Sequence, residues 1–72
     1  MSRTMTPSDI RDFCKQNVGN RVNVELQDGT GYTGHIVMAT TTMFSIRYRH
    51  HGRTVITKIL FNTVDYVEAE PY

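Results

Sequence analysis

The clearest structural signal lies in residues 21–36, which read RVNVELQDGTGYTGHI. Polar and apolar residues alternate through its first seven positions, a period typical of a strand with one buried face. Asp28 and Gly29 follow, and this pair is a strong signal for a tight hairpin turn. The stretch therefore predicts two antiparallel strands, over about residues 21–27 and 30–39.

The second of these strands contains two glycines, Gly31 and Gly34. Glycine weakens a strand unless a bend, a bulge or a close backbone approach requires it. Two glycines in one strand therefore predict sharp curvature, of the kind that closes a small barrel.

The flanking sequence adds one helix and three more strands. Thr6 can cap a helix and Pro7 suits its first position, so we expect a helix over residues 7–17. Its apolar stripe must pack on the sheet, because so short a helix is not stable alone in water. Residues 1–5 show no pattern and are expected to form a loose terminus. Apolar alternation and β-branched residues predict further strands over 43–49, 53–61 and 64–68.

The predicted fold is thus mostly β. We expect one domain over residues 1–72, in which an N-terminal helix precedes a five-stranded, strongly bent antiparallel sheet or small barrel. Short strands joined by short turns favour this architecture over a flat, open sheet.

A chain of 72 residues and 8.3 kDa is short for a self-sufficient core. A domain of this size removes only about 60% of its unfolded surface from water, and comparable proteins add disulfides, a metal or oligomerisation. One cysteine excludes an intrachain disulfide, and the three histidines do not have metal-ligand spacing. No metal or other cofactor is expected, so oligomerisation is the predicted source of additional stability.

Composition also indicates the cellular compartment in which the protein is found. Its 39% hydrophobic and 21% charged residues are typical of a globular chain. No apolar run approaches the roughly 18 residues of a membrane span, and the first residues lack the apolar segment of a signal peptide. With a single cysteine, these features predict a cytoplasmic (intracellular) protein that does not contact membranes.

The net charge of +1 conceals an uneven distribution. Residues 47–58 carry four basic and no acidic residues, so the rest of the chain carries −3. The basic residues lie mainly on a predicted hairpin, where arginines beside an aromatic residue can meet phosphates and bases. The alternative is a solvated hairpin tip whose charges keep the protein soluble. The candidate basic surface comprises Arg47, Arg49, His50, His51 and Arg53.

No catalytic pattern is visible, and we expect no enzymatic activity. The sequence has no glycine-rich phosphate loop, carboxylate pair or nucleophile constellation. His50 and His51 are expected to be turn residues and not a metal site, because neighbouring strand residues point to opposite faces and cannot easily chelate one ion. Cys14 falls on the apolar stripe of the predicted helix, where it is expected to fill the core.

The order of one helix and five strands resembles the Sm-like proteins, including the bacterial Hfq branch, over roughly residues 6–68. Three features of the first Sm motif carry the resemblance: a strand that leads into Asp28-Gly29, a second glycine five residues later at Gly34, and an apolar residue nine positions beyond it, Met43. The other matching apolar residues are Val22, Val24, Leu26, Tyr32 and Ile36.

The sequence departs from the family at several functional positions. Sm proteins usually carry Asp and Asn where this chain has Thr40 and Phe44, and Arg-Gly-Asn where it has Leu60-Phe61-Asn62. The Tyr-Lys-His of Hfq is replaced by Thr57-Lys58-Ile59, and Glu25 stands where that branch often has an aromatic residue.

The resemblance implies a homo-oligomeric ring of about five to seven subunits that binds single-stranded RNA. In such a ring the fourth strand of one subunit pairs with the fifth strand of the next. The implied RNA contacts are stacking by Met43 or Phe44, hydrogen bonds from Thr40, Thr41, Thr42 and Asn62, and a phosphate contact by Lys58. Apolar residues on both faces of the fourth strand agree with a covered edge.

The resemblance therefore predicts a ring-forming, RNA-binding Sm-like protein. One alternative is an oligomeric protein-interaction scaffold that has lost its nucleotide pocket, which predicts an apolar pocket of Phe44, Leu60 and Phe61. Another is a monomeric SH3-like barrel that binds peptides, which predicts a solution mass of 8.3 kDa.

Overall fold

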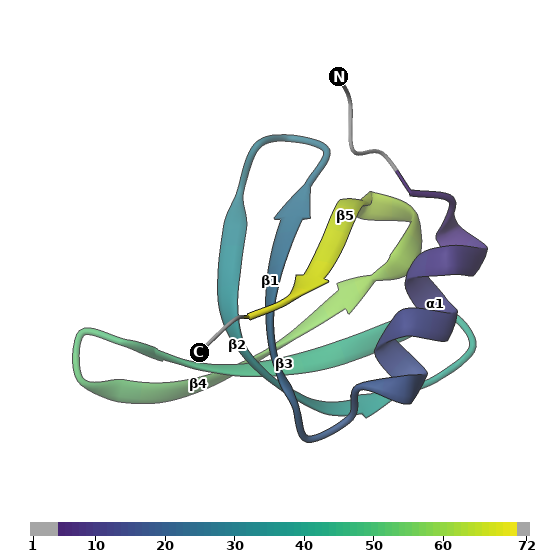
Figure 1. Cartoon of the computed structure of the whole chain (residues 1–72). Coiled ribbons are helices and arrows are strands. Elements are labelled where there is room, and N and C mark those ends of the chain that lie inside the picture. Colours follow the sequence, from purple (N-terminus) through teal and green to yellow (C-terminus); the bar gives the residue numbers. More distant parts are fainter. Residues whose placement is uncertain (1–4, 71–72) are drawn as a thin grey trace.

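We analysed a computed structural model of the chain, which describes residues 5–70 (Figure 1). One helix precedes five antiparallel strands, and a short 3₁₀ helix joins the last two strands. The predicted mostly-β architecture is confirmed, with element ends within about one residue of those expected. The elements are α1 (Pro7–Gln16), β1 (Arg21–Leu26), β2 (Gly31–Ala39), β3 (Met43–His50), β4 (Arg53–Leu60), η1 (Phe61–Thr63) and β5 (Val64–Ala69).

Helix α1 begins as its sequence predicts. The Thr6 hydroxyl oxygen accepts a hydrogen bond from the Asp9 backbone N–H at 3.1 Å, and Pro7 occupies the first turn. Ile10 and Cys14 are buried against the sheet, and α1 packs on β2, β5 and η1. The chain is held before the helix as well, because the Met5 N–H donates to the Asp65 carbonyl at 2.9 Å. The expectation of a loose terminus over residues 1–5 is thus wrong for Met5, and residues 1–4 lie outside the described residues.

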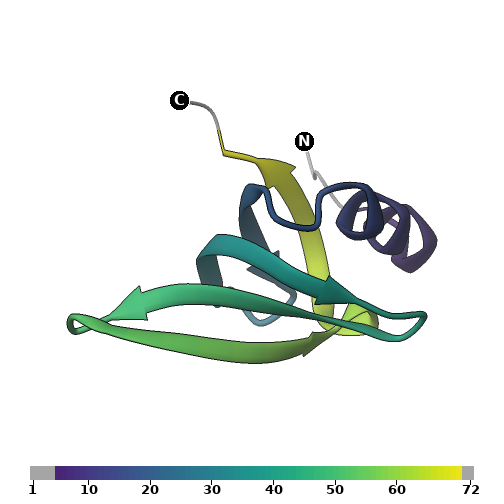
Figure 2. The same ribbon diagram turned by 90° about the horizontal axis from the view of Figure 1, so that it is seen from below.

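The five strands form one sheet in the order β4-β3-β2-β1-β5. Strands β4 and β5 are its two edges, and the described residues contain no pairing between them, so the sheet is bent but not closed. The expected barrel therefore remains open within one chain. Figure 2 shows the β3–β4 hairpin as a long arm that extends away from α1.

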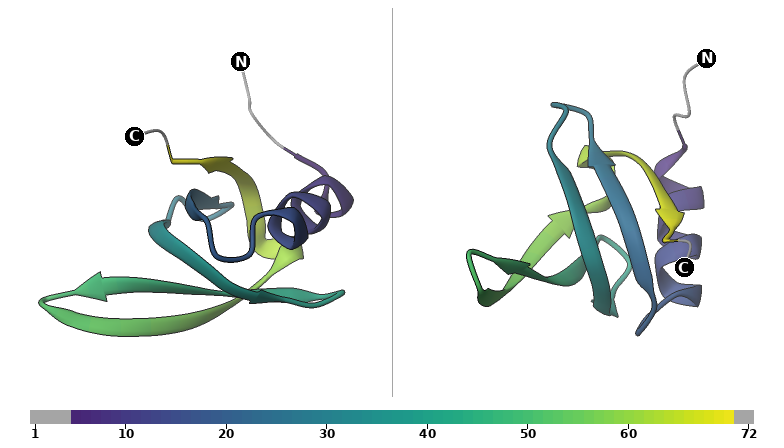
Figure 3. Two further views of the ribbon diagram at one scale, coloured as in Figure 1. Left: turned by 60° about the horizontal axis from the view of Figure 1, so that its bottom comes forward. Right: turned by 60° about the vertical axis from the view of Figure 1, so that its left-hand side comes forward.

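The bend in β2 depends on Gly34 and not on Gly31. A Cβ atom added at Gly34 would lie 3.0 Å from the Tyr48 Cβ and closer still to the Arg47 backbone, whereas one at Gly31 would meet only a carbonyl oxygen at 3.8 Å. Strand β2 pairs with β3 only from His35 onward. Its first residues, from Gly31 to Gly34, pair with β1 alone. The β1–β2 and β3–β4 hairpins separate at this point (Figure 3).

The core lies between α1 and the concave face of the sheet. Phe44 and Phe61 stack at its centre with ring centroids 5.6 Å apart. The other buried apolar residues are Ile10, Cys14, Val22, Val24, Ile36, Ile46, Ile59, Val64 and Val67. Burial raises the pKa of the Cys14 thiol to about 12, as expected for a cysteine that fills a core.

The predicted Asp28-Gly29 turn is confirmed, and of the two histidines expected in the next turn only His51 lies there, because His50 ends β3 paired with Arg53. Gly29 adopts a φ of +91° after Asp28, and the Asp28 carboxylate accepts a hydrogen bond from the Thr30 N–H at 2.9 Å, which lowers the pKa of Asp28. His51 lies in the β3–β4 turn with a φ of 52°.

Within residues 5–70, no helix is both long and apolar enough to cross a membrane.

Candidate nucleic-acid interface

A pocket of about 430 Å³ opens where the β2–β3 connection, η1 and the start of α1 meet. We call it the loop pocket. It contains two of the predicted threonines and the predicted asparagine, together with helix residues that the sequence analysis did not identify. Its lining comprises Pro7, Ser8, Arg11, Thr41, Thr42, Leu60, Phe61 and Asn62.

Thr40 shapes this pocket without lining it. Its hydroxyl oxygen accepts hydrogen bonds from the N–H groups of Thr42 and Met43 at 3.3 and 3.2 Å, and its hydroxyl also donates to the Met43 carbonyl at 3.2 Å. These bonds fix the turn and leave the side chains of Thr41 and Thr42 exposed. The Phe61 N–H donates to the Thr42 carbonyl at 3.1 Å, which ties the turn to η1.

Asn62 is held in place through its backbone. The Gln27 side-chain amide donates to the Asn62 carbonyl at 3.0 Å, and the Thr63 hydroxyl donates to the Leu60 carbonyl at 2.7 Å. The exposed Asn62 side chain makes no hydrogen bond with the described part of the chain. Its amide is therefore available to donate to and accept from a base edge.

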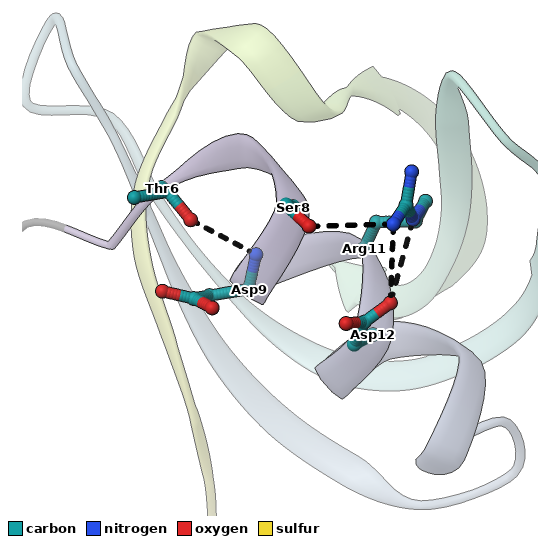
Figure 4. Close-up of polar contacts among 5 residues, drawn as sticks. All are labelled: Thr6, Ser8, Asp9, Arg11 and Asp12. Carbon is teal, nitrogen blue, oxygen red and sulfur yellow. Dashed lines mark hydrogen bonds and ion pairs between the residues drawn. The ribbon is translucent and has the colours of Figure 1, made fainter.

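The cation at the loop pocket is Arg11 (Figure 4). Its guanidinium donates to the Ser8 hydroxyl at 3.3 Å and forms an ion pair with Asp12 at 3.4 Å. This exposed pair is weak, so the guanidinium can exchange its partner for a phosphate at little cost. The i, i+3 spacing of Ser8 and Arg11 places the two side chains on one face of α1. The sequence does not show that this face borders the pocket, because that depends on how α1 packs on the sheet.

Three predicted RNA contacts lie elsewhere. Phe44 is 0% exposed in the core, so the prediction that it stacks on a base is wrong. Lys58 pairs with Ser45 and lies on the sheet face away from Phe44, outside the loop pocket. Met43 is half-buried opposite Leu60, and it does not line the pocket either.

The basic residues of the β3–β4 hairpin are exposed, as predicted. Arg47 and Arg49 share one face of β3, and Arg53 begins β4. The rings of His50 and His51 meet edge to face with centroids 4.2 Å apart. No group of three or more His, Cys, Asp or Glu side chains between residues 5 and 70 has the geometry of a metal site.

Tyr48 is not positioned to stack on a base beside these arginines. It points to the opposite face of β3, and its ring centroid lies 5.3 Å from that of Tyr32. Its hydroxyl also lies 3.2 Å from the Thr57 hydroxyl. Tyr48 therefore packs β3 against β2 and β4.

The chemistry of the loop pocket suits binding. Its threonine hydroxyls and the Asn62 amide can hydrogen-bond base edges, the Arg11 guanidinium can pair with a phosphate, and Leu60 supplies apolar surface. It has no acid–base pair among its lining residues. A scan against protein-family models and a search of curated proteins each returned no match for this chain.

Proposed function

We propose that this chain is an Sm-like protein that forms a ring of about five to seven copies and binds single-stranded RNA without catalysis. One observation carries the proposal: the loop pocket lies at η1, the connection between the two edge strands β4 and β5. Assembly through these edges repeats the pocket at each junction. Several weak sites on one ring then bind a strand by avidity.

The two edges have complementary chemistry. On β4, Ile56 and Leu60 are 58% and 48% exposed, an unusual amount of apolar surface for an uncovered edge strand. The charged residues of β4 are basic and those of β5 are acidic. Pairing of β4 with β5 of a second copy covers the apolar residues and brings opposite charges together.

The lining of the loop pocket supports RNA binding over the scaffold alternative. A scaffold that had lost its nucleotide pocket would place Phe44, Leu60 and Phe61 around an apolar hollow. Leu60 and Phe61 do line the loop pocket, but Phe44 is buried in the core, and the pocket also presents hydroxyl, amide and guanidinium groups. A cytoplasmic location also belongs to this proposal, because RNA is available there and a single buried cysteine suits a reducing compartment.

Fluorescence anisotropy with labelled oligo-U and oligo-A at low and moderate salt tests RNA binding. We expect binding at micromolar ring concentration, and we expect Asn62→Ala and Arg11→Gln each to weaken it about threefold to tenfold, roughly 0.7–1.4 kcal/mol. The matched control is Lys15→Gln, which removes a cation from α1 away from the loop pocket. An absence of binding at both salt concentrations would contradict the proposal.

A further inference from the structure

A second cleft, of about 420 Å³, opens where β2 separates from β3. The pairing between these strands ends at His35 and Arg47, while β3 continues with β4 as far as His50 and Arg53. The cleft therefore has one wall on each hairpin. We call it the basic cleft. Its lining includes Arg21, Thr33, His35, Arg47, Tyr48 and Arg49, with Thr54 on β4.

The sheet register aligns these side chains on one face. Arg21 pairs with His35, and His35 pairs with Arg47, so three basic side chains lie side by side across three neighbouring strands. Arg49 follows two residues after Arg47 and therefore points to the same face, opposite Thr54. Adjacent strands lie about 4.8 Å apart and residues i and i+2 about 6.7 Å apart, so the cations form an extended array.

The guanidinium groups of this array form no ion pair with the described residues. No acidic side chain lines the cleft, and the guanidinium groups of Arg21 and Arg47 make no hydrogen bond or ion pair with residues 5–70. Glu70 lies beside Arg21 through a backbone hydrogen bond of 3.0 Å, but the two side chains form no ion pair there. Arg21 and Arg47 flank His35 in this row, and a bound anion offsets the repulsion between the guanidinium groups.

We propose that the basic cleft binds the phosphodiester backbone of single-stranded nucleic acid, as a second site separate from the loop pocket. One row of the array consists of Arg21, His35 and Arg47 on three strands, and Arg49 lies in the second row. An array of this extent fits successive phosphates better than one free phosphate ion. Thr33 and Thr54 add hydroxyl donors at the second row. The Tyr48 ring packs against Tyr32 on the other face of β3, so the arginine side chains offer the cleft contacts to phosphates, which carry no sequence information.

This inference rests on the proposed RNA-binding function, and the salt dependence of binding tests it. Each arginine–phosphate contact in a single-strand complex contributes about 0.7 to the slope of log affinity against log salt. Arg47→Gln combined with Arg21→Gln should therefore weaken oligo-U and oligo-A equally and lower the slope by roughly 1.4. Lys15→Gln, the control, should leave the slope unchanged. A double variant with the wild-type affinity and slope would overturn the inference.

Amide chemical-shift mapping separates this inference from the loop-pocket proposal. An oligonucleotide should shift the amides of residues 33–35 and 47–49 at the basic cleft, and Arg47→Gln with Arg21→Gln should abolish those shifts. Shifts confined to residues 41–42 and 61–62 would overturn the cleft and leave the loop pocket standing. Shifts at the cleft alone would support the cleft and contradict the loop pocket, and no shifts at all would overturn both. Equal shifts with inorganic phosphate at matched phosphate concentration would overturn the assignment to a polynucleotide.

Discussion

At Gly34 the backbone of β2 lies so close to β3 that no side chain fits. A Cβ there would lie 2.9 Å from the Arg47 carbonyl carbon and 3.0 Å from the Tyr48 Cβ. Because the nearest atoms belong to backbone and not to a flexible side-chain end, the strands themselves must move to accommodate it. This one residue fixes the bend between the two hairpins and so the position of the basic cleft.

Gly34→Ala should therefore destabilise the protein by about 1–3 kcal/mol, the usual cost of overpacking. Gly31→Ala is the matched control in the same strand, where the nearest atom to a new Cβ is 3.8 Å away. The control should change stability by no more than about 1 kcal/mol and can increase it by restricting the unfolded chain. Urea unfolding at one protein concentration compares the two variants. Equal midpoints for both would contradict the steric role of Gly34.

Cys14 allows a second test at the scale of one residue. Its side chain is 0% exposed, and burial raises its pKa from the ordinary 9.0 to about 12. The folded state thus favours the neutral thiol. Below about pH 9 the thiol is neutral in both the folded and the unfolded chain, and the free energy of unfolding should fall as the pH rises from about 9 towards 12, because the unfolded thiol ionises first. The thiol should react with dithiobis(nitrobenzoate) far more slowly at pH 8 in the native protein than in denaturant. Rapid stoichiometric reaction of the native protein would contradict this burial.

At the scale of elements, local sequence patterns predicted most of the fold. The two-residue period in β1, the Asp28-Gly29 turn and the Thr6-Pro7 helix start are all signals that act over a few residues, and the structure confirms them. The alternation in β3 also places Phe44 on the buried face. Its role as a stacking residue came from the family resemblance, and the burial of Phe44 shows that the local pattern was the better guide.

The functional surfaces were less predictable because they depend on how elements pack. Arg11 reaches the loop pocket only because the Ile10 and Cys14 stripe turns that side of α1 towards η1. Arg21 and His35 join Arg47 only because the register of three strands aligns them. The spacing of Ser8 and Arg11 within α1 does not show which way the helix packs, and the alignment across three strands has no signal within any one strand.

The edge strand β4 carries the element-scale prediction. Ile56→Asp should fold, because the Ile56 side chain is 58% exposed, but it should weaken assembly about tenfold or more, roughly 1.4 kcal/mol. Ile56→Lys should weaken it less, because a lysine still faces the acidic β5 of the next copy. Val18→Asp, at a position 47% exposed outside the strands, is the control. Sedimentation velocity measures all three, and an unchanged assembly in Ile56→Asp would contradict edge pairing.

At the scale of the whole molecule, assembly connects the fold to its proposed function. A chain of 72 residues has a small core, and the two edge strands of its sheet carry opposite charges. The loop pocket lies between these edges, and the basic cleft lies on the sheet where the hairpins separate. Ring closure would supply the missing burial and repeat both surfaces around a common axis.

The mass of the native protein in solution, measured by light scattering coupled to size-exclusion chromatography, tests the ring most directly. We expect a single species of about five to seven times the 8.3 kDa chain mass, stable on dilution through the micromolar range. A monomer of 8.3 kDa at the same concentrations would contradict the ring and favour the SH3-like alternative.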